Sequence, residues 1–178
     1  MEQAPEKDLR YPVGRYEPTP VLTPELREQF ILEIEALPAR MRAAVAGLSD
    51  AQLDTEYRPG GWTVRQVAHH VPDSHVNSYC RFKFALTEDV PTIKTYDEAA
   101  WAALPDSRGG VEVSLALLDA LHERWVRLLR GMSEADYARR LQHPEWGELT
   151  LDAMLGLYEW HCRHHVAHIT SLRERMGW

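Results

Sequence analysis

The sequence lacks the features that would place it in a membrane, on nucleic acid or in an oxidising compartment. No apolar run approaches the roughly 18 residues of a membrane helix, and the first residues form neither the basic nor the apolar segment of a secretory signal. The formal net charge is −7, without the basic stripe that phosphate backbones require. There are only two cysteines, Cys80 and Cys162, both in predicted helices. We therefore expect a cytoplasmic protein with free thiols, no membrane segment and no nucleic-acid partner.

Several catalytic motifs are also absent. The sequence has no Gly-x-Ser-x-Gly elbow, no P-loop, no dinucleotide-binding glycine fingerprint and none of the Glu-x-x-His pairs of di-iron bundles. His122 precedes Glu123, but Val126 stands where the zinc-protease helix motif requires a second histidine. Serine-hydrolase, NAD-dependent and phosphate-transfer chemistry therefore have no support in the sequence.

Histidine is concentrated near the end of the chain instead. Four of the nine histidines fall within eight consecutive residues, inside a proline-free run over residues 150–176 that begins with a capping threonine and predicts a helix. At about 100° per residue, His161 and His165 lie beside the apolar stripe of this helix. His164 and His168 fall further toward its polar side, so only the first pair is expected to lean into the core.

A second histidine site lies upstream, on a helix expected over residues 63–86. Glycines and a capping threonine mark its start. Its apolar face places His70 toward the core, whereas His69 points almost directly away. Pro72 lacks a backbone donor, so we expect a kink just after His70 or a break there.

Three neutral imidazoles from two facing helices, those of His70, His161 and His165, suit Zn²⁺ or a similar divalent ion. Three protein ligands leave one coordination position open, which indicates catalysis rather than a closed structural site. Surface or core histidines satisfied by hydrogen bonds are the alternative. On the same reasoning, Cys162 is expected to be a buried structural thiol rather than a further ligand.

Few polar groups lie near this predicted site. Asp73 and Asn77 share the side of the helix that bears His70, and they are candidates for hydrogen bonds that fix an imidazole tautomer. Asp73 and Glu159 are the nearby carboxylates that could act as a general base, and both are weak candidates.

The helical pattern as a whole predicts an all-α fold, a four-helix bundle in one domain over residues 1–178. Residues 1–22 hold four of the eleven prolines and are expected to form an extended arm laid over that domain. Pro38 should bend or split the first helix. The four helices are expected over residues 23–47, 63–86, 117–131 and 150–176.

Two further patterns concern the connections between these helices. A capping signature at Ser49, after the first helix, recurs 84 residues later at Ser133, after the third; it indicates either two facing helix pairs or a chance similarity. A long connection over residues 87–110, between the second and third helices, carries Tyr96, Asp97 and Trp101. This connection either roofs a substrate pocket or only spans the bundle.

The chain resembles the YfiT-like branch of the DinB/YfiT superfamily of metalloenzymes. The resemblance is carried by segments spread over nearly the whole chain: residues 11–14, 53–55, 57–67, 69–71, 73–75, 81–83, 96–98, 121–125 and 158–169. It implies a four-helix bundle and a homodimer, with one divalent metal per chain, zinc or nickel, held by His70, His161 and His165. Pro72 departs from the alanine usual in this family, which puts the local helix geometry in question. Six tryptophans also favour a dimer interface.

Three functions are compatible with such a site. A metal-dependent hydrolase would activate water for attack on an ester or amide of a small molecule. A thiol S-transferase would activate a low-molecular-weight thiol, and members of the superfamily resemble bacillithiol or mycothiol S-transferases. A metal-binding bundle without turnover is the third. The absence of an unmistakable base leaves the first two open.

Overall fold

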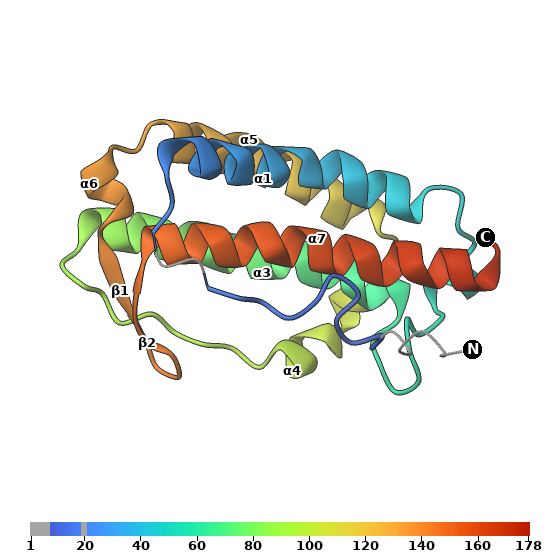
Figure 1. Ribbon diagram of the computed structural model, residues 1–178. Helices are drawn as coiled ribbons and strands as arrows, with labels where there is room; N and C mark the ends of the chain where they lie inside the picture. Colours follow the sequence, from blue (N-terminus) through green and yellow to red (C-terminus); the bar gives the residue numbers. More distant parts are fainter. Residues whose placement is uncertain (1–7, 19–20) are drawn as a thin grey trace, which may run out of the picture.

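The computed structural model describes residues 8–18 and 21–178, and four long helices dominate it (Figure 1). The expected arm over residues 1–22 lies partly outside the described residues, at 1–7 and 19–20. The long helices are α1 (Pro24–Val45), α3 (Val64–Thr87), α5 (Glu112–Arg130) and α7 (Leu151–Met176). The short elements are α2 (Asp50–Leu53), α4 (Glu98–Ala102), η1 (Pro105–Arg108), α6 (Glu134–Tyr137), β1 (Arg140–His143) and β2 (Gly147–Thr150). The predicted four-helix bundle is confirmed.

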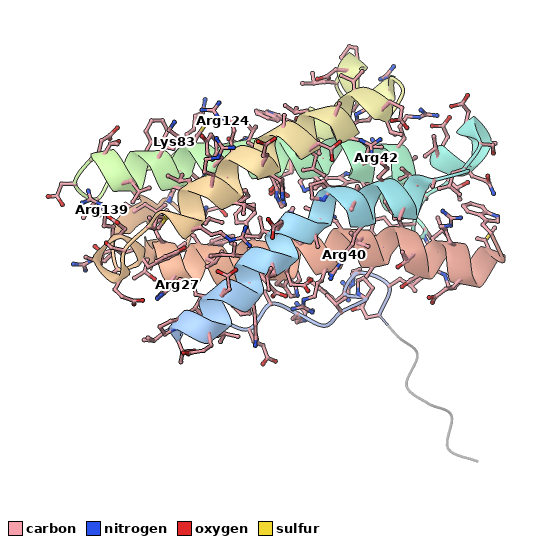
Figure 2. All side chains as sticks on the ribbon, turned by 90° about the horizontal axis from the view of Figure 1, so that it is seen from above. Arg27, Arg40, Arg42, Lys83, Arg124 and Arg139 are labelled. Atoms are coloured by element: carbon pink, nitrogen blue, oxygen red, sulfur yellow. The ribbon has the colours of Figure 1, made fainter. Side chains whose placement is uncertain are left out.

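The long helices form a closed ring around one core. Helix α1 packs against α5 and α7, and α3 packs against the same two helices. Seen from above, α1 crosses obliquely over α7 (Figure 2). Figure 1 shows α1 running parallel to α7, and α3 parallel to α5. Because α3 and α5 run in the same direction, the chain between them has to return along the whole bundle, which explains the long connection.

Prolines interrupt neither of the two helices that contain them. Helix α1 continues through Pro38 and α3 continues through Pro72, so neither helix is split or broken there, and the alternatives of a bend at Pro38 and a kink after His70 stay predictions. Both prolines are buried against neighbouring elements. Packing of the amphipathic faces therefore holds each helix through the missing hydrogen bond.

The two halves of the chain repeat one supersecondary pattern. Ser49 caps α2 and Ser133 caps α6, each with a complete capping box, as the spaced signatures predicted. In the first half, an antiparallel bridge joins Glu56 to Thr63 just before α3; in the second, the hairpin β1–β2 precedes α7, with Arg140 opposite Thr150. The hairpin was not predicted from the sequence.

The hairpin and the arm cover the side of the bundle formed by α3 and α7 (Figure 1). The backbone of Gln142 in β1 pairs with residues 91 and 93 of the long connection, which ties that connection to the hairpin. The arm runs along α7, where the Trp160 indole donates to the Gly14 carbonyl at 3.1 Å. Among the described residues, the helices are too short or too polar for a membrane span.

Candidate metal centre

Three histidines converge where α3 faces α7. One ring nitrogen from each of His70, His161 and His165 lies within 4.8 Å of the others. Two ligands in a tetrahedral zinc site with bonds of about 2.1 Å lie roughly 3.4 Å apart, so a small rotation of the rings closes this trio on one ion. The trio predicted from helix facing is thus brought together, and its binding of metal stays a prediction.

Burial keeps these imidazoles neutral. It lowers the pKa of His70 to about 4 and holds the pKa values of His161 and His165 well below the ordinary value, with the neighbouring histidines adding to the effect. A neutral imidazole offers a lone pair to a cation without first losing a proton. The donor set therefore fits a divalent transition metal at neutral pH.

A chain of hydrogen bonds through two more histidines fixes the orientation of His161. His122 Nδ1 lies 2.6 Å from the Ile34 carbonyl, His75 Nδ1 lies 2.9 Å from His122 Nε2, and His161 Nδ1 lies 3.0 Å from His75 Nε2. A carbonyl only accepts, so His122 Nδ1 carries the proton and its Nε2 accepts. His75 Nδ1 must then donate to His122 Nε2, and His161 Nδ1 must donate to His75 Nε2. Both histidines therefore carry their proton on Nδ1. The Nε2 lone pair of His161 is left free for a metal.

Two hydroxyl groups border this lone pair. Ser74 Oγ lies 3.3 Å from His161 Nε2 and also 3.3 Å from the Tyr158 hydroxyl, which in turn lies 3.2 Å from the Ser74 carbonyl. Because Tyr158 donates to that carbonyl, the Ser74 hydroxyl donates either to Tyr158 or to His161. When a cation takes the His161 lone pair, Ser74 still has Tyr158 as an acceptor, so metal binding leaves no hydroxyl unsatisfied.

The trio forms one wall of a cavity of about 620 Å³. Aromatic rings provide much of the lining, and Trp62 lies against His70 with ring centroids 4.5 Å apart. The other lining residues come from α3, α7, the hairpin and the long connection: Ser74, Arg81, Thr95, Tyr96, Asp97, Glu98, Ala99, His143, Glu145, Trp146, Leu157, Tyr158, Trp160 and His164. The connection therefore does contribute to the cavity. This is the role that the sequence left open.

The other histidines of these two helix segments do not join the trio, although His164 lines its cavity, and none of them is exposed. His69 is buried under residues 109–114, with Nδ1 2.7 Å from Ser114 Oγ. His168 stacks on Tyr57 at 4.0 Å and donates from Nε2 to the Arg10 carbonyl. His164 stacks on Trp160. The expectation that these histidines face the polar, solvated sides of their helices is wrong. The arm and the inter-helix loops cover faces that a helical wheel assigns to solvent.

The carboxylates nominated from the sequence lie elsewhere. Asp73 is half-buried facing η1, where burial and the nearby Asp106 raise its pKa. Asn77 donates to the Asp73 backbone carbonyl at 2.8 Å, and neither residue bonds to His70. Glu159 pairs with Arg163 one turn away on α7, outside the cavity. Neither carboxylate lines the cavity, and no partner from the sequence bonds to His70, so the role of Asp73 or Glu159 as a base stays a prediction that the geometry does not favour.

Cys162 is buried where α7 meets α1, and burial raises its thiol pKa well above the ordinary value. It lines a separate cleft with Val13 and Leu37 and belongs to no metal-ligating cluster among the described residues. The structural thiol expected from the sequence is confirmed.

The sequence did not nominate Glu98, one of three carboxylates that line the cavity, with Asp97 and Glu145. Glu98, in the first turn of α4, lies at the cavity edge, and partial burial raises its pKa although Arg81 acts to lower it. His75 and His122 were also missed. Both occupy positions on apolar stripes, His75 between Val71 and Phe82, and a histidine on such a stripe was the available signal.

Known proteins are similar to this chain over most of its length. The DinB superfamily model matches residues 33–169. A "Putative metal-dependent hydrolase" of Bacillus mycoides (strain KBAB4) is 57% identical over 172 residues, covering 97% of this chain and 99% of the relative. One of the same name from Bacillus cereus (strain ZK / E33L) is 56% identical over 171 residues, covering 96% and 99%.

Two solved structures are similar. YfiT from Bacillus subtilis, described as "a probable metal-dependent hydrolase with an unusual four-helix bundle topology", matches with a TM-score of 0.93 and 50% identity, covering 96% of this chain and 98% of that one. TT2238, a four-helix bundle protein, has a TM-score of 0.55 at 20% identity, covering 83% and 98%, and supports the fold alone. The matched family model spans most of the chain, and these relatives span nearly all of it. The chain therefore belongs to the DinB superfamily.

Proposed function

We propose that this protein is a metal-dependent hydrolase of a small-molecule substrate, with one zinc or nickel ion held by His70, His161 and His165. The observation that carries the proposal is the convergence of these three buried imidazoles on one wall of a cavity. The names of the close relatives agree with it. A divalent ion bound by three imidazoles supplies a Lewis acid and lowers the pKa of water to near ~7.

The protein's own groups divide the remaining tasks. The histidine chain from Ile34 orients His161, and Trp62 limits the movement of His70. The hydroxyl groups of Ser74 and Tyr158 border the site and can donate to a substrate oxygen. Glu98 lines the cavity, and partial burial raises its pKa, which favours it as the group that accepts and returns a proton.

Thiol S-transfer, for example from bacillithiol, is the second candidate, and one observation favours it. No carboxylate among the described residues bonds to His70, His161 or His165, and Glu98 belongs to the connection rather than to α3 or α7. A thiol that loses its proton on meeting a cation needs no such base. The thiolate would then displace a leaving group from an electrophile. A metal-binding bundle without turnover is the third possibility.

Metal reconstitution decides between these functions. Protein stripped by a chelator and reloaded with zinc or nickel should hydrolyse members of an ester and amide panel in heavy-oxygen water, with the heavy oxygen entering the acid product. His165→Ala should show none of this activity. Product carrying the thiol when bacillithiol and an electrophile are added, with no hydrolysis, would establish transfer instead. No turnover of either kind in the loaded protein would leave the non-catalytic bundle.

We also propose a cytoplasmic location and a homodimeric assembly; the homodimer rests on the six tryptophans and the family resemblance.

A further inference from the structure

Three arginines are buried among the described residues, and they differ in their partners. Arg27 contacts the carboxylates of Asp152 and Glu134, and Arg65 contacts those of Asp50 and Asp54. Arg81 is 9% exposed, yet it has no carboxylate within 4.0 Å in the described part of the chain. A buried cation without a counter-ion is strongly disfavoured unless something else satisfies it.

The one hydrogen bond that Arg81 makes leaves most of its donors free. Nη2 donates to the Lys94 carbonyl at 2.9 Å, whereas a guanidinium offers five N–H groups. Arg81 also lines the cavity that contains the trio, and no other arginine or lysine of residues 8–18 and 21–178 does so. Its charge also acts on groups around that cavity: burial raises the pKa of Tyr158 and lowers that of His143, and the Arg81 charge acts to lower both pKa values.

We propose that Arg81 forms a carboxylate-binding subsite at the end of the cavity away from the trio. The ligand is a monocarboxylate with an apolar body, whose reactive group lies at His70, His161 and His165 while its carboxylate meets the guanidinium. This inference rests on the proposed function only for the position of the reactive group.

The geometry of α3 sets the length of such a ligand. His70, Ser74 and Arg81 all line the cavity from this helix, and eleven residues separate the first from the last. That separation is about 16 Å along the axis at 1.5 Å per residue. Side chains on a helix lean toward its N-terminus, so the guanidinium reaches back toward His70. The span from the trio to Arg81 is then on the order of 10 Å.

The lining selects a carboxylate over a phosphate. Asp97, Glu98 and Glu145 border the same cavity, so Arg81 is its single fixed cation and a dianion would meet repulsion. A carboxylate matches the fork of one guanidinium and needs only one positive charge. The aromatic rings of Trp62, Trp146 and Trp160 suit the apolar body.

A matched pair of ligands tests this subsite. The probes are 6-mercaptohexanoate and its neutral amide, titrated into cobalt-loaded protein by calorimetry, while absorption shows whether sulfur reaches the metal. In the unaltered protein the acid should bind at least tenfold more tightly than the amide. Arg81→Met should reduce this ratio to about one and leave amide affinity unchanged. Arg81→Lys, which keeps the charge but not the fork, should give an intermediate ratio.

Arg139 provides the control for a tethering role. Like Arg81, it donates to a backbone carbonyl: Arg139 Nη2 lies 2.9 Å from the Glu88 carbonyl, just after α3. Arg139 lies outside the cavity, at the end of that helix (Figure 2). Arg139→Met should therefore preserve the acid-to-amide ratio even if it loosens the connection. A ratio near one in the unaltered protein, or a ratio unchanged in Arg81→Met, overturns the subsite. Absence of the sulfur band with the ratio intact refutes the metal trio instead and leaves the subsite standing.

Discussion

His75 Nε2 lies 3.0 Å from His161 Nδ1, and the bonds behind His75 end on the acceptor-only carbonyl of Ile34. Because the Ile34 carbonyl can only accept, it determines which atom donates in each hydrogen bond of the series from His122 to His161. The backbone of α1 thereby determines which nitrogen on α7 is free to bind a metal, across a path that passes through α5 and α3.

Substitution of His75 tests this relationship. His75→Leu removes the acceptor for His161, so metal affinity should fall about 10- to 100-fold, as it does when partners of ligating histidines are lost. His75→Gln can accept from His161 and donate to His122, and it should stay within a few-fold of the unaltered protein. Competition with a chelator measures both affinities.

Nitrogen-15 NMR of the metal-free protein separates orientation from packing. His161 should be the Nδ1–H tautomer in the unaltered protein and in His75→Gln, and a mixture of tautomers in His75→Leu. His69→Leu also removes a buried, hydrogen-bonded imidazole of α3. Because His69 does not belong to the hydrogen-bond series that ends at His161, this variant should leave the His161 tautomer unchanged. A single Nδ1–H tautomer in His75→Leu would show that the chain does not orient His161.

The sequence predicted the parts of this site that depend on one helix at a time. The facing of His70, His161 and His165 follows from helical periodicity. The partners of His161 depend instead on how four helices meet, because His75 comes from α3 and His122 from α5. Two apolar stripes each carrying a histidine do not reveal that those histidines touch.

The same limit explains the failures at the site. Asp73 shares a helix side with His70, but residues 64–78 of α3 include no exposed residue, and the face that bears Asp73 packs under η1 rather than over the cavity. Helical-wheel reasoning assumes one buried face and one solvated face. Glu98 lies in a connection whose path depends on its pairing with the unpredicted strand β1, so its position could not be inferred from local pattern.

Acid should destabilise the metal-free protein between about pH 6.5 and 4. Burial lowers the pKa of His122 to about 4, so between these values the unfolded chain binds a proton that the native state does not. Stability is therefore full above the unfolded pKa and falls as the pH decreases. The loss for His122 alone is on the order of 3 kcal/mol by pH 4.

Denaturant unfolding of the metal-free protein at pH 7, 6 and 5 measures this slope. His122→Gln cannot take up the proton, so its stability should decline less over the same range. Carboxylates lose their contribution mainly below about pH 4.5, outside most of this window. An equal slope in both proteins would contradict the assignment of this effect to His122.

Asp152→Asn should destabilise the fold strongly. The Asp152 carboxylate accepts two hydrogen bonds from Arg27, at 2.9 and 3.1 Å, with both side chains nearly buried. Figure 2 shows Arg27 near the start of α1, so this pair joins α1 to the first turn of α7. Breaking a buried pair costs about 3 to 5 kcal/mol. The exposed pair Arg127–Glu123 supplies the control, since Glu123→Gln should cost less than about 1 kcal/mol in the same denaturant titration.

The homodimer should be visible in solution. Light scattering at micromolar concentration should give about twice the chain mass of 20.5 kDa. Two of the six tryptophans, Trp101 and Trp146, are exposed, at 37% and 57%, which is the kind of aromatic surface that an interface covers. A mass near that of one chain at this concentration would contradict the prediction.

The last prediction separates the metal ligands from their neighbours, and burial alone cannot do so, because His69 and His164 are buried as well. His70→Ala, His161→Ala and His165→Ala should each abolish stoichiometric metal after dialysis, since two imidazoles and water rarely hold an ion against a chelator. They should also remove the rise in melting temperature that metal gives the unaltered protein.

His69→Ala and His164→Ala should keep about one ion per chain. His69 bonds to Ser114 and the Gly109 carbonyl, so its loss loosens the cover over α3 without touching the trio. His164 is the sharper control, because it borders the same cavity and adjoins His165, but belongs to no metal-ligating cluster among the described residues. Elemental analysis of the five variants decides the matter. Full occupancy in His70→Ala, or metal lost from His164→Ala and retained in His165→Ala, would show that the ion binds a different set of histidines.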